Sequence, residues 1–130
     1  MKNKQSGFTL VEIMIVVAII ALLAAIAIPN LLRAKIAANE SLAKATLRTE
    51  STASETYQTA NDGLYLSSED DLYNANPKYL NTTYCGATVS GYTFNCDFDT
   101  DHYTVTAVPG SASSGTSTFT MTTGGILTES

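Results

Sequence analysis

The strongest constraint on the fold is an apolar run near the start of the chain. Between positions 8 and 28 the sequence reads FTLVEIMIVVAIIALLAAIAI, in which only Thr9 and Glu12 are polar. No charged residue occurs from Ile13 to Leu32. A helix of about 20 residues spans about 30 Å, which is the thickness of the hydrocarbon core of a bilayer. We therefore expect residues 8–30 to form a membrane-spanning helix.

The remainder of the chain has the opposite character. Of the 93 residues from position 38 to position 130, 29 are Ser or Thr. This part is too small and too polar to enclose the apolar helix, so we expect a water-facing domain. The 130-residue chain has a net charge of −5, and because a negative chain repels phosphates, we predict no nucleic-acid partner.

The first seven residues read MKNKQSG and contain two lysines before Gly7. Three interpretations are open. A secretory signal would be cut after the apolar run, where the small residues of LLAAIA offer a weak site. An uncleaved anchor would hold the lysines on the cytoplasmic side of a membrane. A cut after Gly7 would instead leave Phe8 as a new N-terminus.

Glu12 is the only charged residue in the apolar run. A carboxylate within an apolar membrane helix costs about 2.5–3.5 kcal/mol, and less near the end of the helix. Glu12 could therefore lie at the membrane surface, or it could have a cationic partner. A free amine on Phe8, four residues away, would supply that partner within the same chain or a neighbouring one.

The segment GFTLVE, from Gly7 to Glu12, continues as IMIVVAIIALLAAIAIPN to Asn30. It resembles the N-terminal signature of type IV pilins and of the related type II secretion pseudopilins. The resemblance implies that a prepilin peptidase cuts between Gly7 and Phe8 and methylates the amine of Phe8. It also implies that Glu12 attracts the N-terminal amine of a neighbouring subunit, and that the apolar helices form the core of a filament.

Pro29 lies in the middle of a helix-forming stretch. It has no N–H donor, and its ring clashes with the carbonyl of the residue four positions earlier. Because residues 31–60 remain rich in Ala and Leu, we expect the helix to continue to Ala60 with a kink near Pro29, and to stop at Asn61-Asp62-Gly63. Two rows of apolar residues predict a broad packing face: Leu31, Ala34, Ala38, Leu42 and Ala45, and Leu32, Ile36, Ala43 and Leu47.

The predicted fold is α+β and pilin-like. A long kinked N-terminal helix, apolar in its first half, packs on a small antiparallel β-sheet head. Residues 1–7 would be a cleaved leader, 8–30 the membrane and filament-core helix, and 31–130 the head, which includes helix 31–60, loop 61–84 and sheet 85–130. A short helix is expected near Glu69-Asp70-Asp71. Alternating apolar residues predict strands at 92–98, 103–107, 119–121 and 126–127, with turns at 99–101 and 124–125.

Cys85 and Cys96 are the only cysteines. If Ser90-Gly91 is a two-residue hairpin turn, Cys85 and Cys96 lie opposite each other, within range of a disulfide. An oxidising compartment outside the cytoplasm would preserve that bond. A metal-binding pair or two reactive thiols are the alternatives.

Asp97, Asp99 and Asp101 alternate in a D-x-D-x-D pattern, which leaves calcium binding open. However, His102 and Val108 stand where an EF-hand loop needs Gly and Glu, so solvated turn carboxylates are the simpler interpretation. No other metal site and no cofactor is predicted. No nucleophile and base pair is recognisable, so we do not expect an enzyme.

These features predict a structural subunit of a type IV pilus. Its partners would be copies of itself, prepilin peptidase, the inner-membrane assembly machinery and, before assembly, the lipid bilayer. The precursor would reside in the bacterial inner membrane and the assembled filament outside the cell. A type II secretion pseudopilin is the related alternative, and an uncleaved, membrane-anchored periplasmic binding protein is the alternative of another class.

Overall fold

The computed structural model of the chain describes residues 6–130. The chain divides into two compact units, one that ends at Ala34 and one from Lys35 to Ser130, and each is described by itself. Both lysines of the predicted leader lie outside the described residues.

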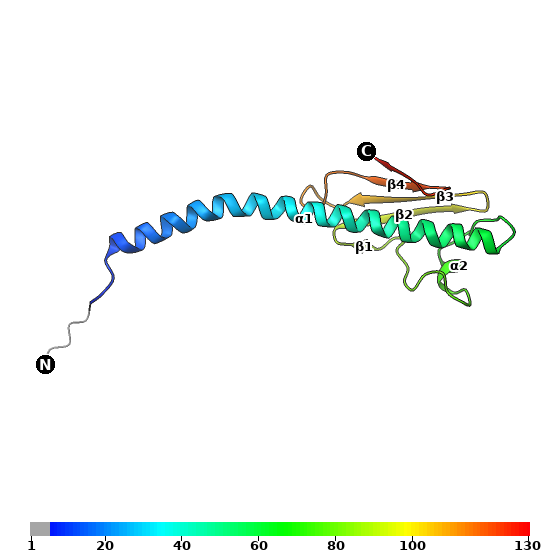
Figure 1. Ribbon diagram of the computed structural model, residues 1–130, viewed down its shortest axis with the longest axis horizontal. Coiled ribbons are helices and arrows are strands. Elements are labelled where there is room, and N and C mark those ends of the chain that lie inside the picture. The colour runs from blue at the N-terminus through cyan, green and yellow to red at the C-terminus, as the bar shows by residue number, and fades with distance from the viewer. Residues whose placement is uncertain (1–5) are drawn as a thin grey trace. The chain divides into compact units, whose positions relative to one another are not determined.

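One long helix, α1 (Leu10–Ala60), passes through both units (Figure 1). It begins two residues later than predicted and ends at the predicted residue. Asp62 and Gly63, which follow it, have φ angles of 55° and 86°, and this left-handed conformation terminates a helix. Pro29 lies inside α1 without ending it, while the expected kink stays a prediction.

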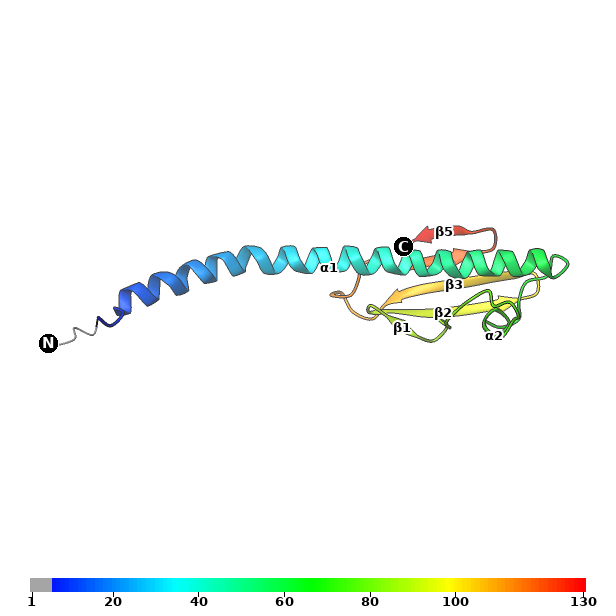
Figure 2. The ribbon, with the colours of Figure 1, turned by 60° about the horizontal axis from the view of Figure 1, so that its bottom comes forward.

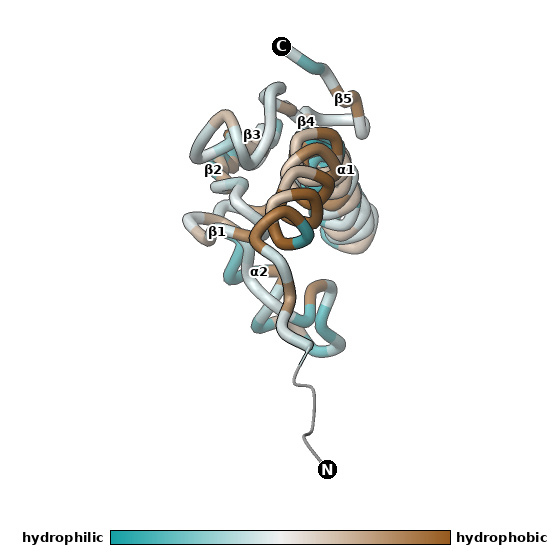
Figure 3. The backbone as a smooth tube through the Cα atoms, turned by 90° about the vertical axis from the view of Figure 1, so that its left-hand side faces the viewer, coloured by the Kyte–Doolittle hydropathy of each residue, from teal (hydrophilic) through white to brown (hydrophobic). Residues whose placement is uncertain are grey.

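Within the first unit, α1 is apolar on every side. Sixteen large apolar side chains between Phe8 and Leu32 are exposed, and the hydropathy colours of Figure 3 show this stretch as the most hydrophobic of the tube. Among the described residues, α1 is the one helix that is long and apolar enough to cross a membrane.

The second unit contains a five-stranded antiparallel sheet. Its strands follow one another in space as they do along the chain (Figure 2). This arrangement confirms the predicted α+β class. The strands are β1 (Thr88–Val89), β2 (Tyr92–Asp99), β3 (His102–Pro109), β4 (Phe119–Thr122) and β5 (Ile126–Glu129).

The core of the second unit lies between α1 and one face of this sheet. Alternate residues of the three central strands face this core, as predicted: those of β4 and the apolar ones of β3 are buried, whereas in β2 Tyr92 and Phe94 are buried and Cys96 and Phe98 are half-buried. The register brings Ala107 between Phe94 and Phe119 on neighbouring strands. The fully or almost fully buried sheet side chains are Tyr92, Phe94, Tyr103, Val105, Ala107, Phe119 and Met121.

The face of α1 that packs on the sheet differs from the predicted one. Ala43 and Leu47 are buried as expected, but Leu42 is 43% exposed and Ala45 is exposed. The remaining buried positions of α1 are mostly polar: Thr46, Glu50, Ser51, Ala53 and Ser54. Polar side chains are tolerated here where they find partners, as Ser51 does by a 2.8 Å hydrogen bond between its hydroxyl and that of Tyr103.

The segment between α1 and the sheet contributes more to the core than its sequence indicated. It contains the expected short helix, α2 (Asp70–Tyr73). Its irregular parts also bury Tyr65, Leu66 and Leu80, and Leu72 is buried within α2. No periodicity marks these positions, because each is placed by a turn of irregular backbone.

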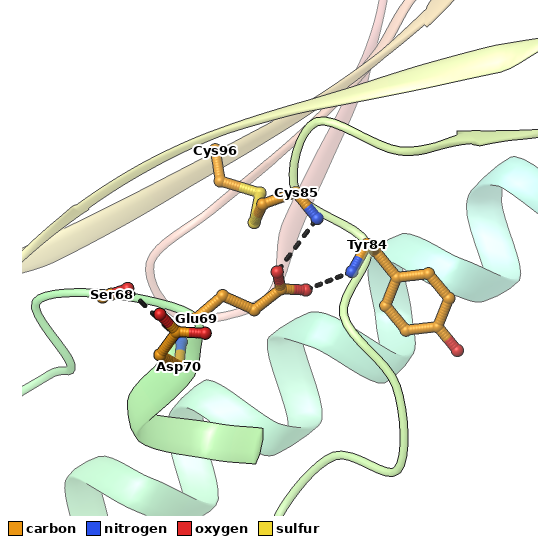
Figure 4. The surroundings of a disulfide bond; sticks show 6 residues. All are labelled: Ser68, Glu69, Asp70, Tyr84, Cys85 and Cys96. Carbon is orange, nitrogen blue, oxygen red and sulfur yellow. Dashed lines mark hydrogen bonds between the residues drawn. A yellow bond between two sulfur atoms is a disulfide. The ribbon is translucent and has the colours of Figure 1, made fainter. Parts of the chain in front are cut away.

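Two carboxyl groups, those of Glu50 and Glu69, are buried beside each other. Glu50 is fully buried, and its carboxyl oxygens have no hydrogen-bond partner among the described residues. Both oxygens of Glu69 accept hydrogen bonds, one from the amide of Tyr84 and one, at 3.0 Å, from the amide of Cys85 (Figure 4). Burial penalises a charged carboxylate, and a neighbouring negative charge penalises it further, so Glu50 keeps its proton to a higher pH than an exposed glutamate does.

Burial is the main reason that the pKa of Glu50 is raised from 4.5 to about 9, and the neighbouring carboxyl group of Glu69 acts in the same direction. In the unfolded chain the same carboxyl ionises near pH 4.5.

The stability of the second unit should consequently depend on pH. The contribution of Glu50 is complete below about pH 4.5 and falls as the pH rises to about 9, by at most about 1.4 kcal/mol per pH unit for one proton. Glu50→Gln keeps a side chain of similar size that does not ionise, so its melting temperature should exceed that of the unsubstituted chain by a margin that widens from pH 5 to pH 9.

The melting temperature can be followed in detergent by the near-ultraviolet circular dichroism of tyrosine, because all seven tyrosines lie in the second unit. The exposed substitution Asp62→Asn serves as the control. A margin that stays constant between pH 5 and pH 9 would show that Glu50 does not titrate differently in the two states.

Candidate functional site

The candidate site is the segment that leads into α1. Residues 6–9 are outside any helix or strand, and Phe8 is 87% exposed. No atom lies within 4 Å of the position that a side chain at Gly7 would occupy. The peptide bond between Gly7 and Phe8 is therefore open to an enzyme on this exposed segment.

Thr9 and Glu12 form a capping box at the start of α1. The amide of Thr9 donates to Oε2 of Glu12 at 2.7 Å, and the hydroxyl of Thr9 donates to the same oxygen at 2.9 Å. The amide of Glu12 in turn donates to the Thr9 hydroxyl at 3.3 Å. This reciprocal pattern satisfies otherwise unpaired amides of the first turn, and it explains why α1 begins at Leu10.

The capping box also fixes where the negative charge lies. It holds the Glu12 carboxylate against the backbone of Thr9, directly beside the position of Phe8. A shallow groove of ≈ 350 Å³ runs along this part of the helix, lined by Phe8, Glu12, Ile13, Ile15 and Val16. The groove is apolar apart from Glu12, so it suits an apolar helix that carries one positive charge.

The N-terminal segment of this chain is also the part that resembles known proteins. Residues 2–28 match the prokaryotic N-terminal methylation motif. The match spans the Gly7–Phe8 bond, the capping box and most of the apolar run, and it confirms the resemblance read from the sequence.

Curated relatives match longer stretches of the chain. The type IV wide pilus major component PilA4 of Thermus thermophilus is 48% identical over 62 residues, which are 48% of this chain and 47% of that protein. The type IV major pilin protein PilA of Myxococcus xanthus is 46% identical over 59 residues, 45% of this chain and 27% of the relative.

A shorter match is to the type IV major fimbrial protein FimA of Dichelobacter nodosus, at 76% identity over 30 residues, 23% of this chain and 19% of that protein. The chain thus spans less than half the length of each of these relatives. No solved structure matches it at a significant level.

The predicted disulfide in the second unit is confirmed. Cys85 and Cys96 are bonded, with their Cα atoms 5.5 Å apart. The pairing of Thr88 with Thr93 and of Val89 with Tyr92 is the register expected from a turn at Ser90-Gly91. The strand before this turn, β1, has only two residues, and Cys85 lies beyond its end.

The three alternating aspartates do not form a metal centre. Among residues 6–130, no group of three or more His, Cys, Asp or Glu side chains is placed to hold a metal ion. Asp97 and Asp99 lie in β2, and Asp101 lies in the turn before β3. Asp99 instead accepts hydrogen bonds from the amide and hydroxyl of Thr100, at 2.6 and 3.2 Å.

Sequence reasoning missed the capping box and the Glu50–Glu69 pair. The T-x-x-E spacing of Thr9 and Glu12 is itself the signature of a capping box, so the first could have been found. Glu50 carries no comparable signal, because its partner comes from a distant, irregular segment.

Loss of the disulfide should destabilise the second unit. Closing a loop with a sequence separation of 11 residues contributes about 2–3 kcal/mol in the chain-entropy model. Reductant should therefore lower the melting temperature followed by the tyrosine signal. The double substitution Cys85→Ser and Cys96→Ser should melt at the lower temperature with or without reductant, and equal melting of the oxidised and reduced chains would contradict this role.

Proposed function

We propose that this chain is the structural subunit of a type IV pilus. The observation that carries the proposal is the start of the chain: a methylation motif over residues 2–28 whose Gly7–Phe8 bond is exposed and whose Glu12 is held beside it. The relatives with the longest matches given above are named as major pilus components. Since their names describe structural proteins, we propose no enzymatic activity.

The first step in this proposal is cleavage between Gly7 and Phe8. Apart from the two chain neighbours of Gly7, no atom of residues 6–130 lies within 4 Å of the Cβ position at Gly7, so this part of the fold does not require glycine there. The requirement would come from prepilin peptidase, which removes residues 1–7 and methylates the new amine of Phe8.

The second step is alignment of subunits by charge. The amine of Phe8 in an incoming subunit pairs with Glu12 of a subunit already in the filament, or Glu12 of the incoming subunit pairs with the Phe8 amine of its neighbour. Opposite charges attract far more strongly in apolar surroundings than in water, so this pair is favoured over any other register of two otherwise uniform helices. Thr9 contributes by holding the carboxylate in place.

The third step is the exchange of lipid for protein around α1. Residues 8–30 would anchor the subunit in the inner membrane and then enter the filament core, while residues 31–130 form the outer surface. Pro29 would mark the bend between these parts. Neither a pseudopilin nor an uncleaved anchored binding protein is favoured by a specific observation.

Replacement of Gly7 tests the cleavage. Gly7→Leu should leave the precursor uncut in the membrane, whereas Ser6→Ala should be processed normally. Intact mass spectrometry of the unsubstituted protein, sheared from cells, should show loss of residues 1–7, one added methyl group and two fewer hydrogens for the disulfide. Normal processing of Gly7→Leu, or an intact leader in the unsubstituted protein, would contradict the proposal.

A pair of substitutions separates the charge of Glu12 from its capping role. Glu12→Gln keeps an acceptor for the Thr9 amide but removes the charge, so cleavage should continue while the yield of sheared filaments falls about tenfold or more, equivalent to about 1.4 kcal/mol. Thr9→Ala removes the cap but keeps the charge, so its yield should fall less. Equal yields from Glu12→Gln and the unsubstituted protein would exclude pairing by charge.

A further inference from the structure

The charges of the second unit are unevenly distributed. Between Lys35 and Ser130 there are four cationic and eleven acidic side chains, a net charge of −7 with His neutral. Copies with this charge repel one another when they are brought together. A filament surface built from them needs contacts in which the few cations of one copy face the acids of the next.

The acids gather at one end of the unit, which we call the acidic cap. The amide of Tyr65 donates to the carbonyl of Thr100 at 2.9 Å, and this bond joins the loop after α1 to the β2–β3 turn. Side chains from the first segment, including Asp70, line a groove together with Asp97. The cap consists of Asp62, Asp70, Asp71, Asp97, Asp99 and Asp101, of which all but the half-buried Asp71 are exposed.

No aspartate of the cap has a cationic partner among the described residues, where the one salt bridge joins Lys44 to Glu129 at 3.4 Å. The cap therefore presents unpaired negative charge to its surroundings. An acidic cluster alone does not indicate a ligand. A second, basic surface of the same unit does indicate one.

That surface, which we call the basic groove, lies where α1 meets the segment before the sheet. It has a volume of ≈ 480 Å³, and its lining includes the exposed cations Arg48 and Lys78 and no acid. The other lining residues are Thr49, Thr52, Ala53, Thr56 and Tyr79.

The threonines of the groove have already used their donors. The hydroxyls of Thr49, Thr52 and Thr56 donate to backbone carbonyls one turn earlier in α1, at 3.1, 2.8 and 2.6 Å. Lys78 keeps its charge near the groove by lying 3.9 Å above the ring of Tyr73. The donors that remain for a ligand are therefore those of Arg48 and Lys78 and the hydroxyl of Tyr79, and the two cations are suited to carboxylates.

We propose that the basic groove of one copy binds the acidic cap of a second copy. This inference rests on the proposed function, because it adds a contact between neighbouring subunits of the filament. The groove and the cap use different residues, so one copy can offer both at once. Such a heterologous contact does not close into a symmetric pair; where its rotation does not close a ring, it extends into an open chain of copies, which is the geometry that a filament requires.

Zero-length carbodiimide coupling of sheared filaments tests the contact, because it joins an amine to a carboxylate that touches it. The expected product is a denaturation-resistant dimer in which Lys78 is bonded to an aspartate of the cap. Lys78→Arg should lose this product yet keep the filament yield, since the charge remains. Lys44→Gln, which removes a lysine outside the groove, should change neither.

Charge reversal gives an independent readout. Arg48→Glu with Lys78→Glu should lower the filament yield and the salt concentration at which filaments dissociate, and Asp97→Lys with Asp99→Lys in the same chain should restore both. Wild-type filaments without the Lys78 product, or a reversal that changes nothing, would overturn this inference and leave the pilus proposal standing. If wild-type cells shed no filaments of this chain, the pilus proposal itself fails. Dissociation by added polyphosphate at constant ionic strength, without any Lys78 product, would assign the groove to a free polyanion instead.

Discussion

The first half of α1 cannot be left in water, and the other features of the chain follow from that constraint. Sixteen large apolar side chains are exposed between Phe8 and Leu32. Each contributes roughly 1.5–3 kcal/mol when removed from water, so the total is on the order of tens of kcal/mol. Lipid and the helices of other copies are the two surroundings that remove this cost. In lipid or among other helices, the carboxylate of Glu12 is the one charged group on this otherwise apolar stretch of helix.

The second half of the same helix meets a different requirement. It must lie close to a sheet of large aromatic side chains, and it does so with small or polar residues such as Ala43 and Ser51. Some hydroxyl and carboxyl groups in this interface are paired, since Glu55 accepts from the hydroxyls of both Tyr65 and Tyr103 at 3.0 Å, whereas the carboxyl of Glu50 and the hydroxyl of Ser54 are buried with no hydrogen-bond partner among the described residues. One continuous helix therefore combines a lipid-like surface with a polar, specific one.

What the sequence predicts depends on how local each signal is. The strands around Phe94 and Val105 were predictable because alternation has a period of two, and the disulfide because a two-residue turn determines which residues face each other. The packing face of α1 could not be predicted, because the rows through Leu42 and Leu47 are similarly apolar. Which row is buried depends on where the sheet packs. The burial of Leu66 and of Glu50 could not be predicted from the sequence either, because it depends on contacts with irregular backbone.

Every strand of the sheet pairs only with its neighbours along the chain. Strand pairing of this kind closes short loops, which lowers the entropy lost before contacts form and favours rapid folding. With two cysteines in the chain, there is also a single way to form an intramolecular disulfide. If such a chain emerges from its α1 end, α1 is present before the sheet, and strands β1 to β5 can be added in the order of synthesis. Folding then requires no pairing with a strand distant in the sequence and no choice between disulfide partners.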